Sequence, residues 1–91
     1  MIHVVIGVLL ALSPINAAFL GTTHALDPST YRVNSFQLIA TGKMYCGMLR
    51  QPVAPTVDDL QWVYKANFIT AAQGAAVQEA AIRFYCPEVR K

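Results

Sequence analysis

Two cysteines, Cys46 and Cys86, are the residues of this 91-residue chain whose type and spacing support the most definite chemistry. Their thiols can form a disulfide in an oxidising compartment, and small domains often need such a cross-link because they bury little surface. The chain-entropy model gives about 4 kcal/mol for closing a loop of roughly forty residues. Two free buried thiols are the alternative. Zinc is disfavoured because a site needs about four ligands, and a redox pair lacks the C-x-x-C spacing.

The side chains that could support acid–base catalysis form no recognisable set. Asp58 and Asp59 are adjacent, but at a helix start their charges complement the helix dipole. Cleavage of residues 1–25 as a signal peptide would also remove both histidines, His3 and His24, which belong to the commonest class of general bases and metal ligands. We therefore expect no enzymatic activity, no catalytic residues, no cofactor and no metal.

The charged residues are few and scattered, and the formal net charge is only +2. A nucleic-acid site needs basic residues clustered on one face. The seven basic residues are instead spread along the chain, at Arg32, Lys43, Arg50, Lys65, Arg83, Arg90 and Lys91. We expect an ordinary solvated surface and no nucleic-acid partner.

The first 25 residues have the composition of a targeting segment. The apolar run from Val4 to Leu12 is shorter than the roughly 20 residues of a membrane span, but it fits the about 7–15 residues of a signal-peptide core. Small residues before Asp27 predict cleavage after Ala25, and cleavage after Ala17 or Ala18 is the earlier alternative.

Two other interpretations of this N-terminal segment remain open. It can be an uncleaved membrane anchor, which would contact the bilayer through residues 1–20, or it can be a buried apolar helix. Signal peptides usually begin with basic residues, and this one has only its amino terminus and His3 there.

After a polar linker over residues 26–33, a domain over residues 34–91 begins with a helical pattern. Apolar residues recur at helical spacing up to Arg50, and Asn34 or Ser35 can cap the start of this helix. Gly42 lies in the middle of the pattern, where glycine costs about 1 kcal/mol relative to alanine. We therefore expect another backbone to approach closely at Gly42.

Two further helices are predicted from their capping residues. Pro52 and Pro55 cannot continue a helix and make residues 51–55 a stiff connector. Thr56 and Asp59 then match a capping box for a helix over 57–67, and Thr70 with Gln73 repeats the pattern for a helix over 71–85. Pro87 ends this last helix, and the residues after it are predicted to fray.

Three aromatic residues of the middle segment, Trp62, Tyr64 and Phe68, are a candidate binding patch. Aromatic side chains dominate protein interfaces when they face solvent. Packing in the core or at its rim is the simpler interpretation of the same residues, and the sequence does not decide between the two.

The order of several motifs resembles a known family. Ala25 precedes Asp27-Pro28, a helix carries Gly42, Cys46 and Leu49, and a Gln- and Ala-rich helix ends in Tyr85-Cys86-Pro87. This pattern, over about residues 36–88, is similar to that of the small secreted proteins of mycobacteria and their relatives grouped as domain of unknown function 732. The resemblance implies an all-helical fold with one disulfide, export to the cell envelope, and structural roles for Gly42, Tyr85 and Pro87. It implies no catalytic or ligand-binding residue.

The predicted fold is therefore an all-α domain of three helices, about 34–50, 57–67 and 71–85, with a Cys46–Cys86 disulfide and a preceding N-terminal hydrophobic signal or anchor helix. The leading hypothesis for function is a non-enzymatic, exported cell-envelope domain with a protein-binding or structural role and a protein partner. The alternative is a membrane-anchored accessory subunit of a larger membrane protein complex, with the domain on the extracytoplasmic side.

Overall fold

The structure is a computed structural model that describes residues 13–90, and its regular elements in this range are all helical. The three predicted helices are confirmed, each end within one residue, as α3 (Ser35–Leu49), α4 (Val57–Ala66) and α5 (Ala71–Phe84). The remaining elements are α2 (Pro14–Leu26) and two short 3₁₀ helices, η1 (Pro28–Arg32) and η2 (Pro87–Arg90). The all-α class is therefore confirmed for the described residues.

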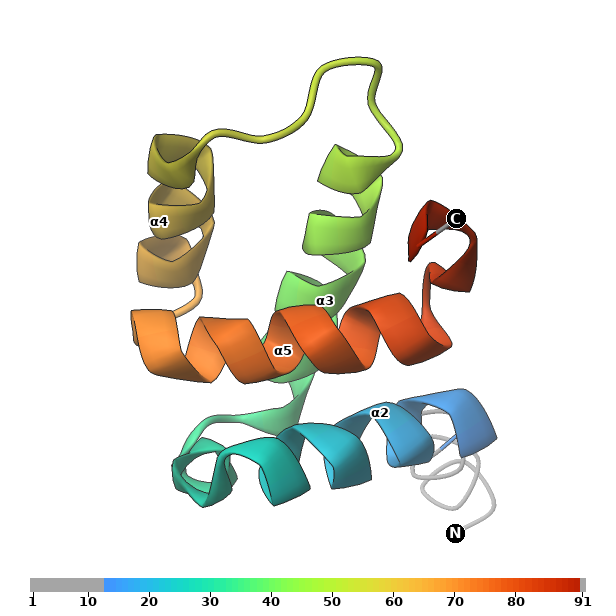
Figure 1. Cartoon of the computed structure of the whole chain (residues 1–91). Coiled ribbons are helices and arrows are strands. Elements are labelled where there is room, and N and C mark those ends of the chain that lie inside the picture. The colour runs from blue at the N-terminus through green and yellow to red at the C-terminus, as the bar shows by residue number, and fades with distance from the viewer. Residues whose placement is uncertain (1–12, 91) are drawn as a thin grey trace, which may run out of the picture.

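The predicted domain of three helices is incomplete: among the described residues α2, which falls in the segment predicted as a signal or anchor helix, is a fourth α-helix and is packed in the domain (Figure 1). Ser13 caps its start by accepting a hydrogen bond from the amide of Asn16, and Pro14 occupies the first turn, where its missing amide donor costs nothing. The apolar run from Val4 to Leu12, and with it the larger part of the anchor predicted over residues 1–20, lies outside the described residues. Within residues 13–90 no helix is both long enough and apolar enough to cross a membrane.

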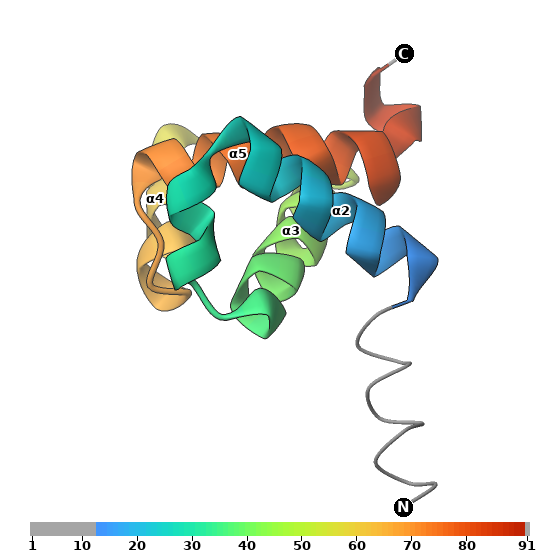
Figure 2. The same cartoon turned by 90° about the horizontal axis from the view of Figure 1, so that it is seen from below.

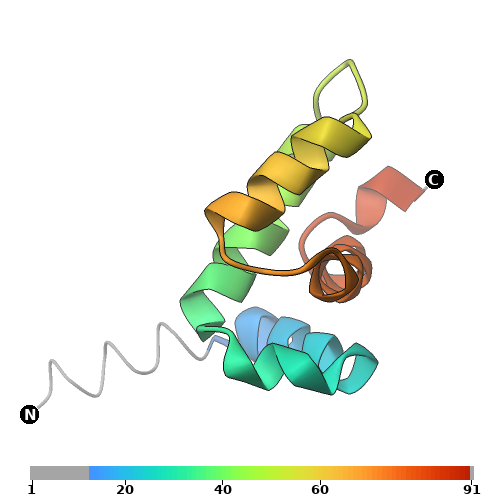
Figure 3. The same cartoon turned by 90° about the vertical axis from the view of Figure 1, so that its left-hand side faces the viewer.

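Helix α5 crosses the middle of the molecule and has α2 lying antiparallel along one side (Figures 1 and 2). The contact between α2 and α5 is the most extensive between any two of the described helices. Helix α3 crosses both of them and contacts both, whereas α4 lies beside α3 at the end of the molecule where α5 begins (Figure 3).

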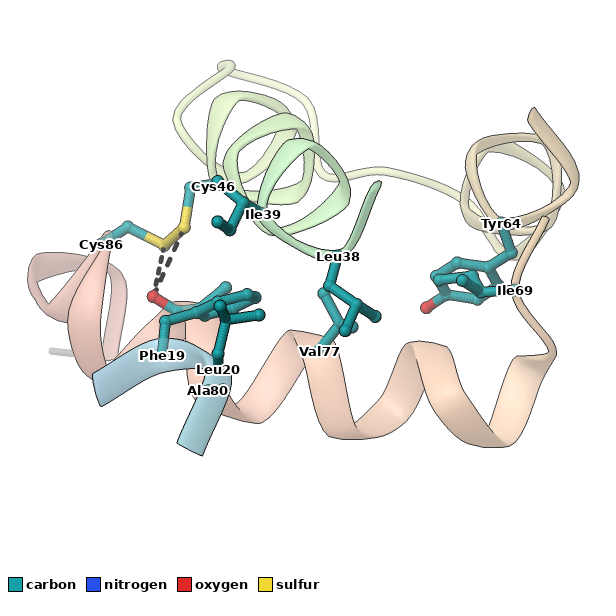
Figure 4. Packing of buried hydrophobic residues seen from close by; sticks show 11 residues of the cluster. Phe19, Leu20, Leu38, Ile39, Cys46, Tyr64, Ile69, Val77, Ala80 and Cys86 are labelled. Atoms are coloured by element: carbon teal, nitrogen blue, oxygen red, sulfur yellow. Dashed lines mark hydrogen bonds between the residues drawn. A yellow bond between two sulfur atoms is a disulfide. The ribbon is translucent and has the colours of Figure 1, made fainter. Parts of the chain in front are cut away.

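The core lies where α2, α3 and α5 meet (Figure 4). Its side chains come from all three helices and from the ends of α4 and α5, and they are apolar or disulfide-bonded: Phe19, Leu20, Leu38, Ile39, Cys46, Tyr64, Ile69, Val77, Ala80, Ala81 and Cys86. The largest of those that are completely shielded from solvent is Phe19, from α2. Because Phe19 belongs to α2, helix α2 is part of the core.

Gly42 is confirmed as a point of close approach, but side chains rather than another backbone approach it. A Cβ atom added at Gly42 would lie 2.8 Å from the ring of Phe19 and 3.2 Å from the ring of Tyr85. These two rings stack with their centroids 4.6 Å apart. Glycine is therefore needed at position 42 because two aromatic rings occupy the space that any other side chain would enter.

The predicted disulfide is confirmed: Cys46 of α3 is bonded to Cys86, which follows α5, across a sequence separation of 40 residues. Both cysteines are buried. The neighbouring Tyr85 hydroxyl donates a hydrogen bond to Oδ1 of Asn16 at 2.5 Å, so the first turn of α2 is joined to the same region. Burial raises the pKa of Tyr85 to about 12.

The helix starts follow the predicted capping chemistry. Asn34 caps α3, and complete capping boxes are formed by Thr56 with Asp59 and by Thr70 with Gln73. In each box the threonine side chain accepts from the amide three residues later, while the later side chain accepts from the threonine amide. These local bonds explain why the helix starts could be predicted without knowledge of the tertiary packing.

The chain after Cys86 is not frayed up to Arg90, as the sequence suggested, but forms η2. Arg50 at the end of α3 donates to the backbone oxygen of Tyr85 at 2.9 Å and forms an ion pair with Glu88. Arg90 forms an ion pair with Glu79 of α5 at 2.7 Å. Pro87 does follow the end of α5 as predicted, and contacts from α3 and α5 hold the chain beyond it.

Candidate functional site

The candidate patch of three aromatic residues is divided by the structure, because Tyr64 belongs to the core. Its side chain is only 8% exposed, and a Cβ atom added at Gly74 of α5 would lie 2.5 Å from its ring. Tyr64 thus packs directly on the backbone of α5 and fixes α4 against it. Burial is also the main cause that raises the pKa of the Tyr64 hydroxyl.

Trp62 lies on the opposite side of α4 from the core and is 67% exposed. Successive helical residues are rotated by about 100°, so Trp62 points roughly 200° away from Tyr64. The residues one turn before and after Trp62 are also exposed, namely Asp58, Asp59, Lys65 and Ala66. Trp62 therefore fulfils the expectation of a solvent-facing aromatic, but it shares no surface with Tyr64.

Phe68, the third aromatic, has the most unusual backbone among the described residues. Its φ is 59°, and it is the one described residue other than glycine with a positive φ. It follows the end of α4 in a Schellman turn, in which the Phe68 amide donates to the oxygen of Lys65 at 3.2 Å and the Ile69 amide donates to that of Tyr64 at 3.0 Å. Glycine usually occupies this position because it has no Cβ to clash.

The Phe68 side chain gains nothing from the fold that would offset this conformation. It is 80% exposed, among the most exposed of the large apolar side chains described. A left-handed conformation costs a non-glycine residue on the order of 1 kcal/mol or more. The Schellman turn itself is complete without the ring, because the apolar contact that accompanies it comes from Ile69, which is buried together with Tyr64. The fold therefore explains the turn but not the phenylalanine.

A shallow hollow of about 370 Å³ lies at the same corner of the molecule. It is lined by residues on either side of Phe68 in the sequence, from the end of α4 to the start of α5: Gln61, Tyr64, Lys65, Ile69, Thr70 and Ala71. The apolar floor of Tyr64 and Ile69 is bordered by the polar side chains of Gln61 and Lys65. We call Phe68 and this hollow the α4 surface; Trp62 lies on the other side of α4.

The adjacent acids Asp58 and Asp59 serve the helix start in this structure. Oδ2 of Asp59 accepts from the Thr56 amide at 2.9 Å, and this bond, followed by a hydrogen bond between the Asp59 carboxyl and the Thr56 side chain, lowers the pKa of that carboxyl. Asp58 is exposed in the same first turn. Over the part of the chain that the structure describes, no three metal-ligating side chains come together.

His24, which a cut after Ala25 would remove, takes part in the contact between α2 and η1. Its Nδ1 lies 2.7 Å from Oγ1 of Thr30, and its ring stacks on Tyr31 with centroids 3.9 Å apart. Because the Thr30 hydroxyl donates its proton to the oxygen of Asp27, Nδ1 of His24 must be the donor to Thr30. Partial burial lowers the pKa of His24.

Comparison with known proteins identifies the family. The chain belongs to the family described as Protein of unknown function (DUF732), whose model matches residues 16–88. This match confirms the family resemblance and extends it upstream from Phe36 to Asn16, so it includes nearly all of α2. No curated protein and no solved structure matches the chain.

Proposed function

We propose that this protein is a non-enzymatic domain that is exported to the cell envelope and binds a protein partner there through the α4 surface. Export is supported by the Cys46–Cys86 disulfide, because such bonds persist mainly in oxidising compartments. A binding role rather than catalysis is supported by the use of Asp59 as a capping residue and by the exposed aromatic residues beside α4.

The observation that carries the proposal is Phe68. A bulky aromatic ring is kept in solvent at a position where glycine would relieve backbone strain. Strain of this kind is typical of functional positions, and exposed aromatic residues are enriched among those that dominate protein interfaces. An apolar ring next to a hollow with polar edges has the make-up of an interface centre with its rim.

Replacement of Phe68 by glycine separates this function from the fold. We expect Phe68→Gly to raise the free energy of unfolding by about 1 kcal/mol, because glycine adopts the left-handed turn without strain. We expect the same substitution to weaken partner binding at least about 30-fold, the effect of losing a hot-spot aromatic. Denaturant unfolding gives the first quantity. The second comes from chemical cross-linking in envelope fractions of the host, followed by titration with the cross-linked protein.

Ile15→Ala is the matched control, because it also removes an exposed apolar side chain. Ile15 adjoins Asn16, which contacts Tyr85 at the far end of the 14-residue helix α5, about 20 Å from Phe68. Binding should be unchanged in this variant. If Phe68→Gly binds the partner as tightly as the unaltered protein does, the α4 surface is not the binding site.

A further inference from the structure

Helix α2 supplies contacts that the rest of the domain cannot replace. The Phe19 side chain is 0% exposed and fills the space above Gly42, where it stacks on Tyr85. Thr23, one turn later, is also fully buried and donates to the oxygen of Phe19 at 2.8 Å. Without α2, the ring of Tyr85 would lose its stacking partner Phe19. The surfaces of α3 and α5 around Gly42 would then be open to water.

The peptide bond that a cut after Ala25 would break lies inside an ordered helix. Helix α2 extends to Leu26, and the Asp27 amide still donates to the oxygen of Thr23 at 3.0 Å. The chain then continues directly into η1, where the bond between His24 and Thr30 joins the two elements. The predicted cleavage site is therefore within the folded domain and not in a linker before it.

The extent of the family match independently supports the assignment of α2 to the folded domain. The match begins at Asn16, the residue whose side chain accepts the hydrogen bond from Tyr85. A removable leader is read by its general composition rather than by a fixed pattern of residues. A family match that extends over residues 16–26 of α2 is what a structural helix would produce.

We infer that α2 belongs to the mature domain: any proteolytic processing of this chain takes place upstream of Asn16, and neither Ala25 nor Ala17 marks the processing site. Phe19 and Leu20 then serve the core, so they are not available to a bilayer. This inference rests on the packing of α2 and does not depend on whether the α4 surface binds a partner.

The direct test is the intact mass of the protein purified from its own host, with the first residue identified by terminal peptide sequencing. We expect the mature chain to begin at residue 16 or earlier, and an unprocessed chain would also support the inference. A chain that begins at any later residue, with Leu26 as the clearest case, would overturn it.

Two matched substitutions test the same inference through the processing reaction. Signal peptidases require small residues next to the cut, and both Ala17 and Ala25 are exposed in the fold, so lysine can replace either without entering the core. We expect the mature masses of Ala17→Lys and Ala25→Lys to differ from the unaltered one by the substitution alone. Accumulation of an unprocessed precursor with either variant would show that the cut lies at that alanine, and the inference would fail.

Discussion

The two ends of α5 differ in how they use apolar side chains. Near Cys86, the rings of Phe19 and Tyr85 pack against Gly42, and the disulfide and the Asn16–Tyr85 hydrogen bond close the same region. Near Thr70, Tyr64 is the main aromatic contact between α4 and α5, while Trp62 and Phe68 point into solvent. The first end is built from buried residues, and the second leaves large aromatic residues unburied.

This difference is consistent with the proposal that the domain uses some of its residues for stability and others for binding a partner. A chain of this size cannot bury enough surface to stabilise every element equally. Packing is concentrated where α2, α3 and α5 meet, and α4 is held through a narrow row of contacts, which includes Tyr64 and Val63. The exposed Phe68 side chain can therefore serve the proposed partner, because it is not part of the core.

The largest expected effect is at the densely packed end. Phe19→Ala should lower the free energy of unfolding by about 3–5 kcal/mol, because it leaves a cavity between Gly42 and Tyr85. Urea denaturation of the oxidised protein measures the loss, and Phe19→Leu, which refills most of the space, should lose far less. Ile15→Ala, an exposed truncation on the same helix, should change stability by no more than about 0.5 kcal/mol. An equal effect of Phe19→Ala and Ile15→Ala would contradict the role given to α2.

The disulfide should contribute the next largest amount. Replacement of Cys46 and Cys86 by serine together should cost about 2–4 kcal/mol, mainly because the unfolded chain becomes less restricted. This cost is measured by thermal unfolding of the double variant and of the unaltered protein, both with and without reductant. Reductant should lower the stability of the unaltered protein and leave the double variant unchanged. If neither protein is affected, the disulfide does not stabilise the fold.

A pair of glycine substitutions compares tight packing with open space. Gly74→Ala places a Cβ atom 2.5 Å from the ring of Tyr64, so we expect α4 to be displaced at a cost of about 1–3 kcal/mol. Gly47→Ala meets nothing within 4 Å and should instead stabilise α3 by up to about 1 kcal/mol through helix propensity. Denaturant unfolding of both variants gives the two signs, and a stabilising Gly74→Ala would show that α4 is not held by this contact.

The smallest expected effect is a pH dependence at the contact between α2 and η1. Burial lowers the pKa of His24 below its ordinary value of 6.5, so the unfolded chain takes up a proton at higher pH than the folded one. The contribution of His24 is therefore fully present above pH 6.5 and decreases as the pH falls below that value. Unfolding measured from pH 7.5 to 5.5 should show a shallow decline that His24→Gln abolishes. A decline of the same slope in His24→Gln would assign it to other groups.

The parts of the fold that could be predicted from sequence are those set by local chemistry. Helices α3, α4 and α5 begin at residues whose own side chains cap them, and Pro52, Pro55 and Pro87 interrupt the chain wherever they occur. The disulfide could be predicted because the chain has only two cysteines. The sequence also allows the prediction that Trp62 and Tyr64 face different sides of α4, because residues two positions apart on a helix point in different directions.

The features that were missed depend on residues far apart in the sequence. The sequence of an apolar segment such as α2 has the same pattern whether the segment is cleaved off or packed in the core. The burial of Phe19 becomes evident only from its contacts with Gly42 and Tyr85, which are distant in the sequence. Ordering of η2 depends on Arg50, which lies 38 residues before Glu88. The left-handed turn at Phe68 has no glycine to mark it, so the residue that carries the functional proposal could not be distinguished by sequence from an ordinary core aromatic.

Native-state hydrogen exchange on the oxidised protein most directly tests the division between the two ends of α5. We expect the amides of Phe19, Thr23 and Val77 to exchange only by global unfolding, and the hydrogen-bonded amides of α4, such as Val63, to exchange at a clearly lower free energy. Exchange of the α2 amides as readily as those of α4, or more readily, would contradict the account, because α2 would then be a peripheral helix and the core would not depend on it.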